Sequence, residues 1–237
     1  LSDRHAIASR KRFIKMNIQT VLACAESAGQ NGCGGGYMQN AGHYFESEGT
    51  TAECMPYNQS MQVGPVCNDA KCSGDKFYAV RGSVREFRGD IDQIQSDIMN
   101  NGPVVAGYQV DASFMSYKGG VFVQPQNMDV KGGHAVVIVG WGYDSGLGRG
   151  YWIVRNSWGP QWGERGYFRF AWNPSNNKND GRFLENMAVS WLPKVTDVRG
   201  GDDNGGDNPP PPNPPPVPDN PPGPQPPQPP PDPAPPL

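Results

Sequence analysis

The sequence predicts an α+β protein in which a helical lobe precedes a β-rich lobe. Near the start of the chain, apolar residues recur at helical spacing. From Phe77 onward, short β-rich runs alternate with glycine turns. A third part, from Gly200 to Leu237, holds 19 of the 26 prolines and is expected to be extended and disordered. We therefore expect a folded domain over residues 1–192 and a tail or linker over residues 193–237.

The first lobe is expected to cover residues 1–76. Apolar spacing predicts helices over about residues 1–12, 18–24 and 38–48, with the glycine-rich turn NGCGGGY between the last two. Residues 49–76 are expected to form a loop. This loop contains three of the five cysteines and the only glycosylation sequon, which begins at Asn58.

The second lobe is expected to cover residues 77–192. The run FYAVRGSVREF predicts a strand, and DIDQIQSDIMNNG predicts a helix that Asp90 caps and Gly102 ends. Six further runs predict strands: VVAGYQV, GGVFV, HAVVIVGWG, GYWIVRNSW, GYFRFAW and ENMAVSW. Short strands separated by glycine turns are typical of an antiparallel barrel or an open sheet.

Charge and hydropathy exclude two classes of partner. The net charge is −3, and five of the 23 acidic residues lie after Gly200, so the body carries 20 basic and 23 − 5 = 18 acidic residues. A near-neutral body predicts no nucleic-acid partner. The longest apolar run, residues 135–139, predicts no membrane span. The polar start of the chain, which lacks an initiating Met, predicts that a further segment precedes it.

The cysteines favour disulfides over a metal site. Five cysteines lie at irregular spacing, at positions 24, 33, 54, 67 and 72. An odd number suits an exported protein in which one cysteine lacks its partner. Zinc is the less favoured alternative because only Cys67 and Cys72 are close in sequence and no histidine lies beside them at ligand spacing.

A histidine at the lip of an apolar run raises the question of catalysis. His134 follows two glycines in GGHAVVIVGWG, where it can be a turn residue or a general base. The second stretch, YWIVRNSWGPQWGERGY, supplies Asn156 and Trp158 after another β-rich run. An imidazole base needs an acceptor that fixes its tautomer, and an asparagine carbonyl oxygen can provide it. A tryptophan over the pair would exclude water. These residues favour the catalytic interpretation.

Together these stretches closely resemble the papain-like cysteine peptidases. GCGGGY resembles the substrate-binding turn of that family, and NGPVVAGYQV with YKGGVF resembles the segment before its catalytic histidine. The resemblance covers about residues 1–192. SDRHAIAS and ECMPY resemble the cathepsin B and cathepsin X branch most. The implied fold has two lobes: a truncated helical left lobe and an antiparallel, β-barrel-like right lobe.

The resemblance implies roles for the site residues. His134 corresponds to the catalytic base and Asn156 to its orienting partner, with Trp158 as a shield and Trp162 beside it. Three glycines are implied to contact an extended peptide substrate through their backbone: Gly35, Gly36 and Gly133. The family's second-subsite selector is expected near residues 184–186.

The chain departs from the family at the nucleophile. The family's cysteine, in a Cys-Gly-Ser-Cys-Trp context with a glutamine shortly before it, has no counterpart in this sequence. The chain as given is therefore predicted to be inactive. The resemblance implies the disulfides Cys24–Cys67 and Cys54–Cys72, and it leaves Cys33 unpaired because its partner belongs to the absent segment.

The implied function is that of a cysteine endopeptidase with an open cleft. Paired histidines that close the cleft in cathepsin B have no counterpart between Cys54 and Cys72. No metal or organic cofactor is implied. Expected partners are polypeptide substrates and a propeptide or cystatin-like inhibitors, and the protein is expected to be a monomer. Secretion or a lysosomal or endosomal location is expected.

Two rival functions are considered. The first is a catalytically inactive homologue that acts as a binding or matrix protein; retention of His134 and Asn156 argues against it, and a serine at the upstream nucleophile position would favour it. The second is an interaction protein whose proline-rich tail is bound by aromatic grooves. Unchanged binding and localisation after deletion of the tail would exclude the second rival.

Overall fold

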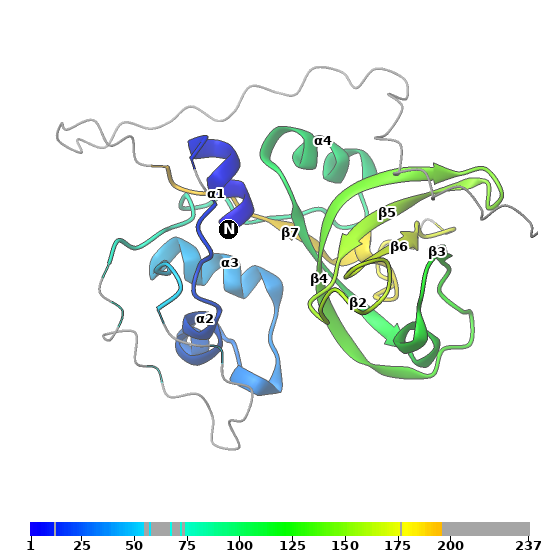
Figure 1. The fold of residues 1–237 in the computed structure, drawn as a ribbon, viewed down its shortest axis with the longest axis horizontal. Coiled ribbons are helices and arrows are strands. Elements are labelled where there is room, and N and C mark those ends of the chain that lie inside the picture. Colours follow the sequence, from blue (N-terminus) through cyan, green and yellow to red (C-terminus); the bar gives the residue numbers. More distant parts are fainter. Residues whose placement is uncertain are drawn as a thin grey trace, which may run out of the picture.

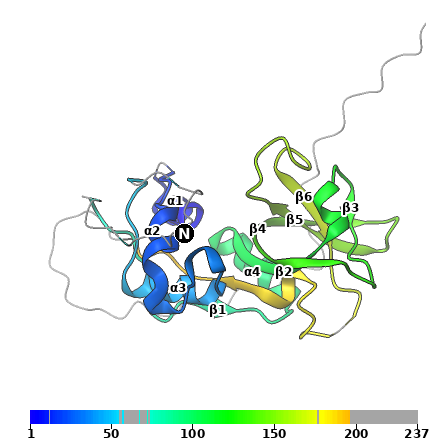
Figure 2. The ribbon, with the colours of Figure 1, turned by 90° about the horizontal axis from the view of Figure 1, so that it is seen from below.

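The computed structural model describes residues 1–11, 13–54, 57, 67, 72, 74–175 and 177–195 (Figure 1). The tail predicted to be disordered lies outside these residues from position 196 onward, and so does the sequon at Asn58. Figure 2 shows the helices of the first lobe grouped on one side and most of the sheet on the other.

The first lobe contains the three predicted helices. They are α1 (Ser2–Ser9), α2 (Ile18–Cys24) and α3 (Met38–Ser47). α2 begins at residue 18 because the side-chain oxygen of Asn17 accepts hydrogen bonds from the backbone N–H groups of Gln19 and Thr20, at 3.0 and 3.4 Å. α1 has no side-chain cap at its start.

Disulfides fasten the long loop of the first lobe. Both expected pairs are present, Cys24–Cys67 and Cys54–Cys72, and Cys33 is free and exposed. Removal of such crosslinks typically costs about 2–5 kcal/mol in small secreted domains. The sulfur of Cys54 also accepts from the Asn17 side chain at 2.9 Å, which links the loop to the cap of α2.

The second lobe contains helix α4 and a seven-stranded sheet. α4 (Ile91–Asn101) begins at Asp90, whose side chain accepts from the Gln93 N–H at 3.0 Å, and it ends at Gly102, where φ is 99°. The strands are β1 (Arg85–Glu86), β2 (Val104–Asp111), β3 (Val121–Phe122), β4 (Val130–Asp144), β5 (Arg149–Arg155), β6 (Tyr167–Ala171) and β7 (Ala188–Ser190).

The sheet is open rather than closed into a barrel. The strand order is β1-β7-β2-β4-β5-β6-β3. β4 is the longest strand and pairs antiparallel with both β2 and β5, whereas β3 and β6 pair parallel. The expected α+β architecture is therefore confirmed. Of the two arrangements that the sequence predicted for the strands, the described residues form the open sheet and not the barrel, and the parallel β3–β6 pair departs from the antiparallel pattern.

Each lobe has its own hydrophobic core. The core of the second lobe is rich in aromatic residues, and its largest members are fully buried: Ile94, Tyr108, Phe114, Trp152, Phe168 and Phe170. The smaller core of the first lobe includes Tyr44 and Phe45 together with Val189 and Trp191, which come from β7 and the residue after it. β7 therefore connects the lobes, as its position in Figure 1 shows.

Several predicted strands are shorter than the sequence indicated; β3, for example, covers only Val121–Phe122 of the run GGVFV. In the run 77–87 only β1 is a strand; Phe77 and Ala79 instead form isolated bridges to Thr50 and Pro193. Their partners belong to different segments, so no continuous ladder forms. In the run 185–191 the first three residues belong to a 3₁₀ turn, Leu184–Met187, the next three form β7, and Trp191 lies outside the strand.

None of the described helices is both long enough and apolar enough to cross a bilayer.

Candidate active site

His134 and Asn156 meet at the edge of the second lobe. His134 is the fifth residue of β4, in register with Tyr108 of β2, and therefore does not begin its strand as predicted. Asn156 directly follows β5, the other neighbour of β4. The His134 Nε2 atom lies 2.8 Å from the Asn156 Oδ1 atom. The sheet thus brings together two residues that are 22 positions apart in sequence.

The hydrogen bonds of Asn156 fix the tautomer of His134. The Asn156 Oδ1 atom also accepts from the Ser157 backbone N–H at 2.8 Å, which identifies this atom as an oxygen. Nε2 of His134 must then be the donor. In the neutral imidazole the lone pair consequently lies on Nδ1, which has no hydrogen-bond partner among the described residues. Nδ1 is therefore free to accept a proton.

Tryptophans cover this hydrogen bond. The Trp158 ring stacks on the imidazole, with ring centroids 4.9 Å apart and an interplanar angle of 29°. Trp162 packs edge-on against Trp158, also at 4.9 Å, and its Nε1–H donates to the Met115 carbonyl at 3.3 Å. Phe114 from the core supports both indoles. The pair is thus shielded on one side by aromatic rings.

The segment after Asn156 is held by its own contacts. The Asn156 N–H donates to the Gly166 carbonyl at 2.9 Å, which closes the loop between β5 and β6. Glu164 and Arg169 form a bidentate ion pair with a shortest contact of 2.6 Å. This pair raises the pKa of the Arg169 guanidinium, chiefly through the hydrogen bond to Glu164. The loop that carries the two tryptophans therefore has a defined conformation.

The opposite wall of the site is the glycine turn of the first lobe. Gly35 has a φ of 98°, which favours glycine, and both its N–H and its C=O bond within the turn. At Gly36, a Cβ atom would overlap the Gln30 side chain at 1.4 Å. Within the described part of the chain, no hydrogen bond uses the Gly36 N–H or C=O. Gly36 is therefore the glycine of this turn whose backbone is available to a ligand.

A cleft lies between the glycine turn and His134. Its volume is about 630 Å³. The first lobe contributes Gly35, Gly36 and Met38, and the second contributes the predicted Gly133, His134 and Met187, among others. None of the five cysteines lines this cleft. The cleft is therefore lined by an imidazole and by the glycine turn, and by no cysteine thiol.

An apolar groove adjoins the cleft. It has a volume of about 350 Å³ and shares Gly35, Gly36 and Met38 with the cleft. Its apolar lining comes from both lobes: Ile18, Val21, Leu22, Ala41, Val105, Ala135 and Trp191. Ile18 is 54% exposed although it starts a helix that faces this groove. The groove is thus an uncovered apolar surface of the kind that marks a contact site.

The residue beside the cleft differs from the one expected. Leu184 and Glu185, in the segment where the selector is expected, are fully buried and do not line the cleft. Met187 lines the cleft instead, opposite Met38 and close to Gly107, where a Cβ atom would meet the Met38 Cε atom at 2.8 Å. The 3₁₀ turn rotates successive side chains to different sides. Met38, Gly107 and Met187 were not identified from the sequence because no catalytic motif contains them.

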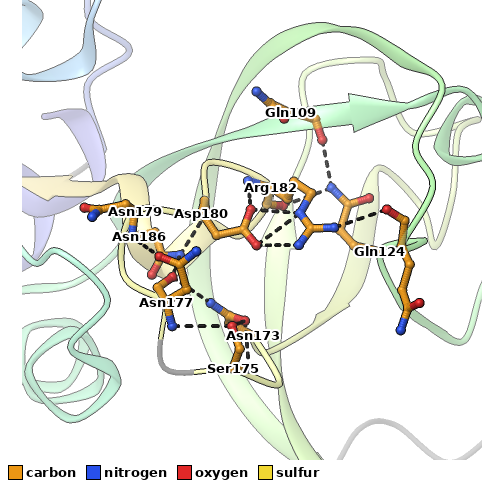
Figure 3. Close-up of polar contacts among 10 residues, drawn as sticks. Gln109, Gln124, Asn173, Ser175, Asn177, Asn179, Asp180, Arg182 and Asn186 are labelled. Carbon is orange, nitrogen blue, oxygen red and sulfur yellow. Dashed lines mark hydrogen bonds and ion pairs between the residues drawn. The ribbon is translucent and has the colours of Figure 1, made fainter.

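A polar loop supports this wall (Figure 3). Arg182 forms a bidentate ion pair with Asp180, at 2.6 Å for the closest contact, and this pair lowers the pKa of the Asp180 carboxyl. The Asn186 side chain donates to the carbonyls of Asn177 and Asp180, at 3.0 and 2.8 Å. The Gln124 side chain donates to the carbonyls of Gln109 and Arg182. The residue before Met187 is therefore fixed by the loop.

The buried Glu185 side chain also holds this loop in place, through a hydrogen bond to Asn173. Its carboxylate accepts from the Trp152 Nε1–H at 3.0 Å and from the Asn173 backbone N–H at 2.5 Å. Burial raises the pKa of Glu185, although these two hydrogen bonds oppose the shift. A raised pKa means that the folded chain holds this proton to higher pH than the unfolded chain does. The contribution of Glu185 to stability is thus complete below the ordinary pKa of 4.5 and is lost as pH rises through the raised value.

Glu185→Gln is therefore expected to flatten the pH dependence of stability. The free energy of unfolding of the unmodified chain should fall more steeply with increasing pH than that of the variant. Urea unfolding at several pH values from 4 to 8 measures both slopes. Glu48→Gln, at an exposed carboxylate, is the control and should leave the slope unchanged. Equal slopes for the unmodified chain and Glu185→Gln would contradict the prediction.

No metal centre is evident in the parts of the chain that the structure describes. No three His, Cys, Asp or Glu side chains gather there in a way that could hold an ion.

Comparison with known proteins links this site to one family. A family described as "Papain family cysteine protease" matches residues 1–188. The chain is 33% identical over 226 residues to "Cathepsin B-like cysteine proteinase 4" of Caenorhabditis elegans, a match that covers 82% of this chain and 65% of the relative. It is 35% identical over 172 residues to "Cathepsin B-like CP2" of Giardia intestinalis, which covers 70% of this chain and 56% of the relative.

A solved structure gives the same result for the fold. The structure of "proCathepsin B S9 from Trypanosoma congolense" matches with a TM-score of 0.66 at 26% identity and covers 82% of this chain and 65% of that chain. The chain thus spans 56% and 65% of the length of the two curated relatives.

Proposed function

The chain belongs to the papain family of cysteine proteases, and we propose that it supplies the general base and most of the substrate wall of a cysteine endopeptidase. The observation that carries this proposal is the His134–Asn156 hydrogen bond of 2.8 Å under the Trp158 ring, at the edge of a cleft. A merely structural histidine has no need of an oriented, shielded partner together with a free second nitrogen that can accept a proton.

The nucleophile is proposed to come from a segment that precedes Leu1. The apolar groove beside the cleft supports this assignment, because it exposes Ile18, Val21 and Leu22 on the first lobe and Val105 on the second. A helix packed there would bury this surface and would reach the glycine turn, which borders both the groove and the cleft. The relatives are longer than this chain by enough to contain such a segment.

The proposed reaction uses Nδ1 of His134 twice. First, Nδ1 takes the proton of the thiol, and the thiolate attacks the scissile carbonyl carbon. The C–N bond then breaks, Nδ1–H protonates the leaving amine, and an acyl thioester remains. Next, Nδ1 takes a proton from water, whose oxygen attacks the thioester carbonyl. The C–S bond then breaks, the sulfur takes the proton back from Nδ1, and the carboxylic acid product leaves and releases its remaining proton to water. Asn156 holds the imidazole through Nε2–H in every step.

The substrate is proposed to lie as an extended peptide along Gly36. The unpaired N–H and C=O of Gly36 can form two hydrogen bonds to a peptide backbone, as one strand does to another. The wall beside it contains Met38, Met187 and Gly107 and carries no charged side chain. Methionine side chains adapt to different apolar shapes. We therefore assign to this wall an apolar side chain of the substrate.

The remaining expectations are part of the same proposal. Residues 1–192 are assigned to the peptidase domain and residues 193–237 to a tail. Disulfides are rare in reducing compartments. The Cys24–Cys67 and Cys54–Cys72 disulfides therefore support secretion or a lysosomal or endosomal location. Polypeptide substrates and a propeptide or cystatin-like inhibitors are the proposed partners of a monomer.

The test compares the 237-residue chain with the product of the full-length transcript. The chain alone should cleave no fluorogenic peptide, whereas the full-length product should cleave one that carries an apolar residue at the second position before the scissile bond. The difference should exceed about 10³-fold and disappear after treatment with iodoacetamide. A serine at the nucleophile position with no cleavage by either form would decide for a binding protein. Cleavage by the chain alone that is lost in Cys33→Ala would place the thiol in the glycine turn.

A further inference from the structure

Two neighbouring residues of α1 bind different parts of the second lobe. Arg4 is buried and pairs with Asp97 of α4, and it donates to the carbonyls of Gly102 and Pro103 at 3.1 and 2.8 Å. Asp3 instead binds Arg155, the last residue of β5. α1 therefore contacts the second lobe both at α4 and immediately beside the catalytic pair.

The contact between Asp3 and Arg155 is bidentate. Arg155 Nη2 lies 2.7 Å from Asp3 Oδ2, and Arg155 Nη1 lies 3.3 Å from Asp3 Oδ1. The side chains are 28% and 39% exposed for Asp3 and Arg155, respectively. The hydrogen bond to Asp3 raises the pKa of the Arg155 guanidinium. Two parallel hydrogen bonds fix the direction of the guanidinium as well as its distance.

Arg155 directly precedes Asn156, so its contact with Asp3 bears on where Asn156 lies. Arg155 pairs with Val137 of β4 and Tyr167 of β6, and it is the last residue of β5 in this ladder. The next residue is Asn156, whose side-chain nitrogen Nδ2 is buried without a hydrogen-bond partner. The Asn156 side chain is therefore held only through Oδ1, to His134 and Ser157. Its placement depends on where the end of β5 is fixed.

We propose that Asp3 and Arg155 form a positioning pair that fixes the end of β5 and thereby aims the Asn156 Oδ1 atom at His134 Nε2. The proposal rests on the proposed function only in taking His134 and Asn156 as the catalytic pair. It makes α1, a helix of the first lobe, part of the support of a site in the second lobe. Neither residue belongs to a catalytic motif, and the two are 152 positions apart in sequence.

Because Asp3 and Arg155 are partly exposed, their contact should affect the position of Asn156 more than the overall stability of the fold. Exposed ion pairs contribute little to the free energy of unfolding because water screens them. The buried Arg4 pair already attaches α1 to the second lobe. Loss of the Asp3 contact should consequently loosen the end of β5 while the fold remains intact.

The test uses the His134 Nε2–H proton of the 237-residue chain, observed by NMR. The chain has three histidines, so loss of a signal in His134→Ala assigns it. Asp3→Asn is expected to accelerate exchange of this proton with water by about tenfold or more, because exchange requires local opening of the site. Arg155→Lys, which retains the charge but only one contact, should give an intermediate rate. Asp3→Glu should restore slow exchange.

The matched control is Asp92→Asn. Asp92 is also an acidic residue in the first turn of a helix, α4, but it is exposed and forms no ion pair within the described residues. It should change neither the exchange rate nor the urea midpoint. An exchange rate in Asp3→Asn equal to that of the unmodified chain would overturn the positioning role and leave the proposed function intact. Absence of a slowly exchanging His134 proton in the unmodified chain would overturn both.

Discussion

In the full-length product, His134→Ala is expected to lower kcat by about 10²- to 10⁴-fold, the contribution that a positioned general base typically makes. The reason is geometric: Nδ1 of His134 is the free nitrogen beside the cleft, and the described residues offer no second histidine there. KM for a peptide substrate should change little, because the proposed substrate contacts, at Gly36 and at the Met38–Met187 wall, do not involve the imidazole.

Asn156→Ala tests the orienting role separately. The imidazole would keep its nitrogen but lose the acceptor of its Nε2–H, so kcat should fall by about 10²-fold while the base remains present. Steady-state kinetics with a fluorogenic peptide measures both variants. His43→Ala is the control, since His43 is an exposed histidine on α3 that contacts Glu46 at 3.1 Å and lies outside the cleft. Equal activity of His134→Ala and His43→Ala would exclude His134 as the base.

The sequence predicted those helices whose ends are fixed by hydrogen bonds between neighbouring residues. α2 and α4 begin at Asn17 and Asp90 because those side chains bond the first free N–H groups of their helices. The run 77–87 shows the opposite case. Its pairing partners, Thr50 and Pro193, come from distant segments. A pattern within residues 77–87 cannot indicate which distant residues will pair with them. Alternation therefore predicted a strand that the fold only partly forms.

The candidate site was predicted to the extent that sequence motifs carry it. His134, Asn156, Trp158 and the glycine turn occur in recognisable stretches. In the fold, His134 and the glycine turn line one cleft, and Asn156 and Trp158 contact His134. Met187 was missed because a 3₁₀ turn, which the sequence did not indicate, decides which residue of the segment faces the cleft. The Asp3–Arg155 contact was missed because it joins two lobes that are far apart in sequence.

Stability should depend most on the buried pair between Arg4 and Asp97. Both side chains are almost inaccessible to water, at 4% and 7% exposure. Asp97→Ala would leave the Arg4 guanidinium buried without its counter-charge, a change that typically costs about 3–5 kcal/mol. The Asn101 side chain would also lose its hydrogen bond to Asp97, at 2.8 Å. The free energy of unfolding from urea titration measures the loss.

The exposed ion pair between Glu86 and Arg88 provides the comparison. Its side chains are 42% and 79% exposed, so Glu86→Ala should cost less than about 1 kcal/mol. The double variant Arg4→Met, Asp97→Leu should recover only part of the loss. It removes the unpaired charge, but the carbonyls of Gly102, Pro103 and Trp191 would still lack the donors that Arg4 supplies. If Asp97→Ala lowered stability no more than Glu86→Ala, the ion pair with Asp97 would not be what fastens α1 to the second lobe, and the hydrogen bonds from Arg4 to the three carbonyls would hold it instead.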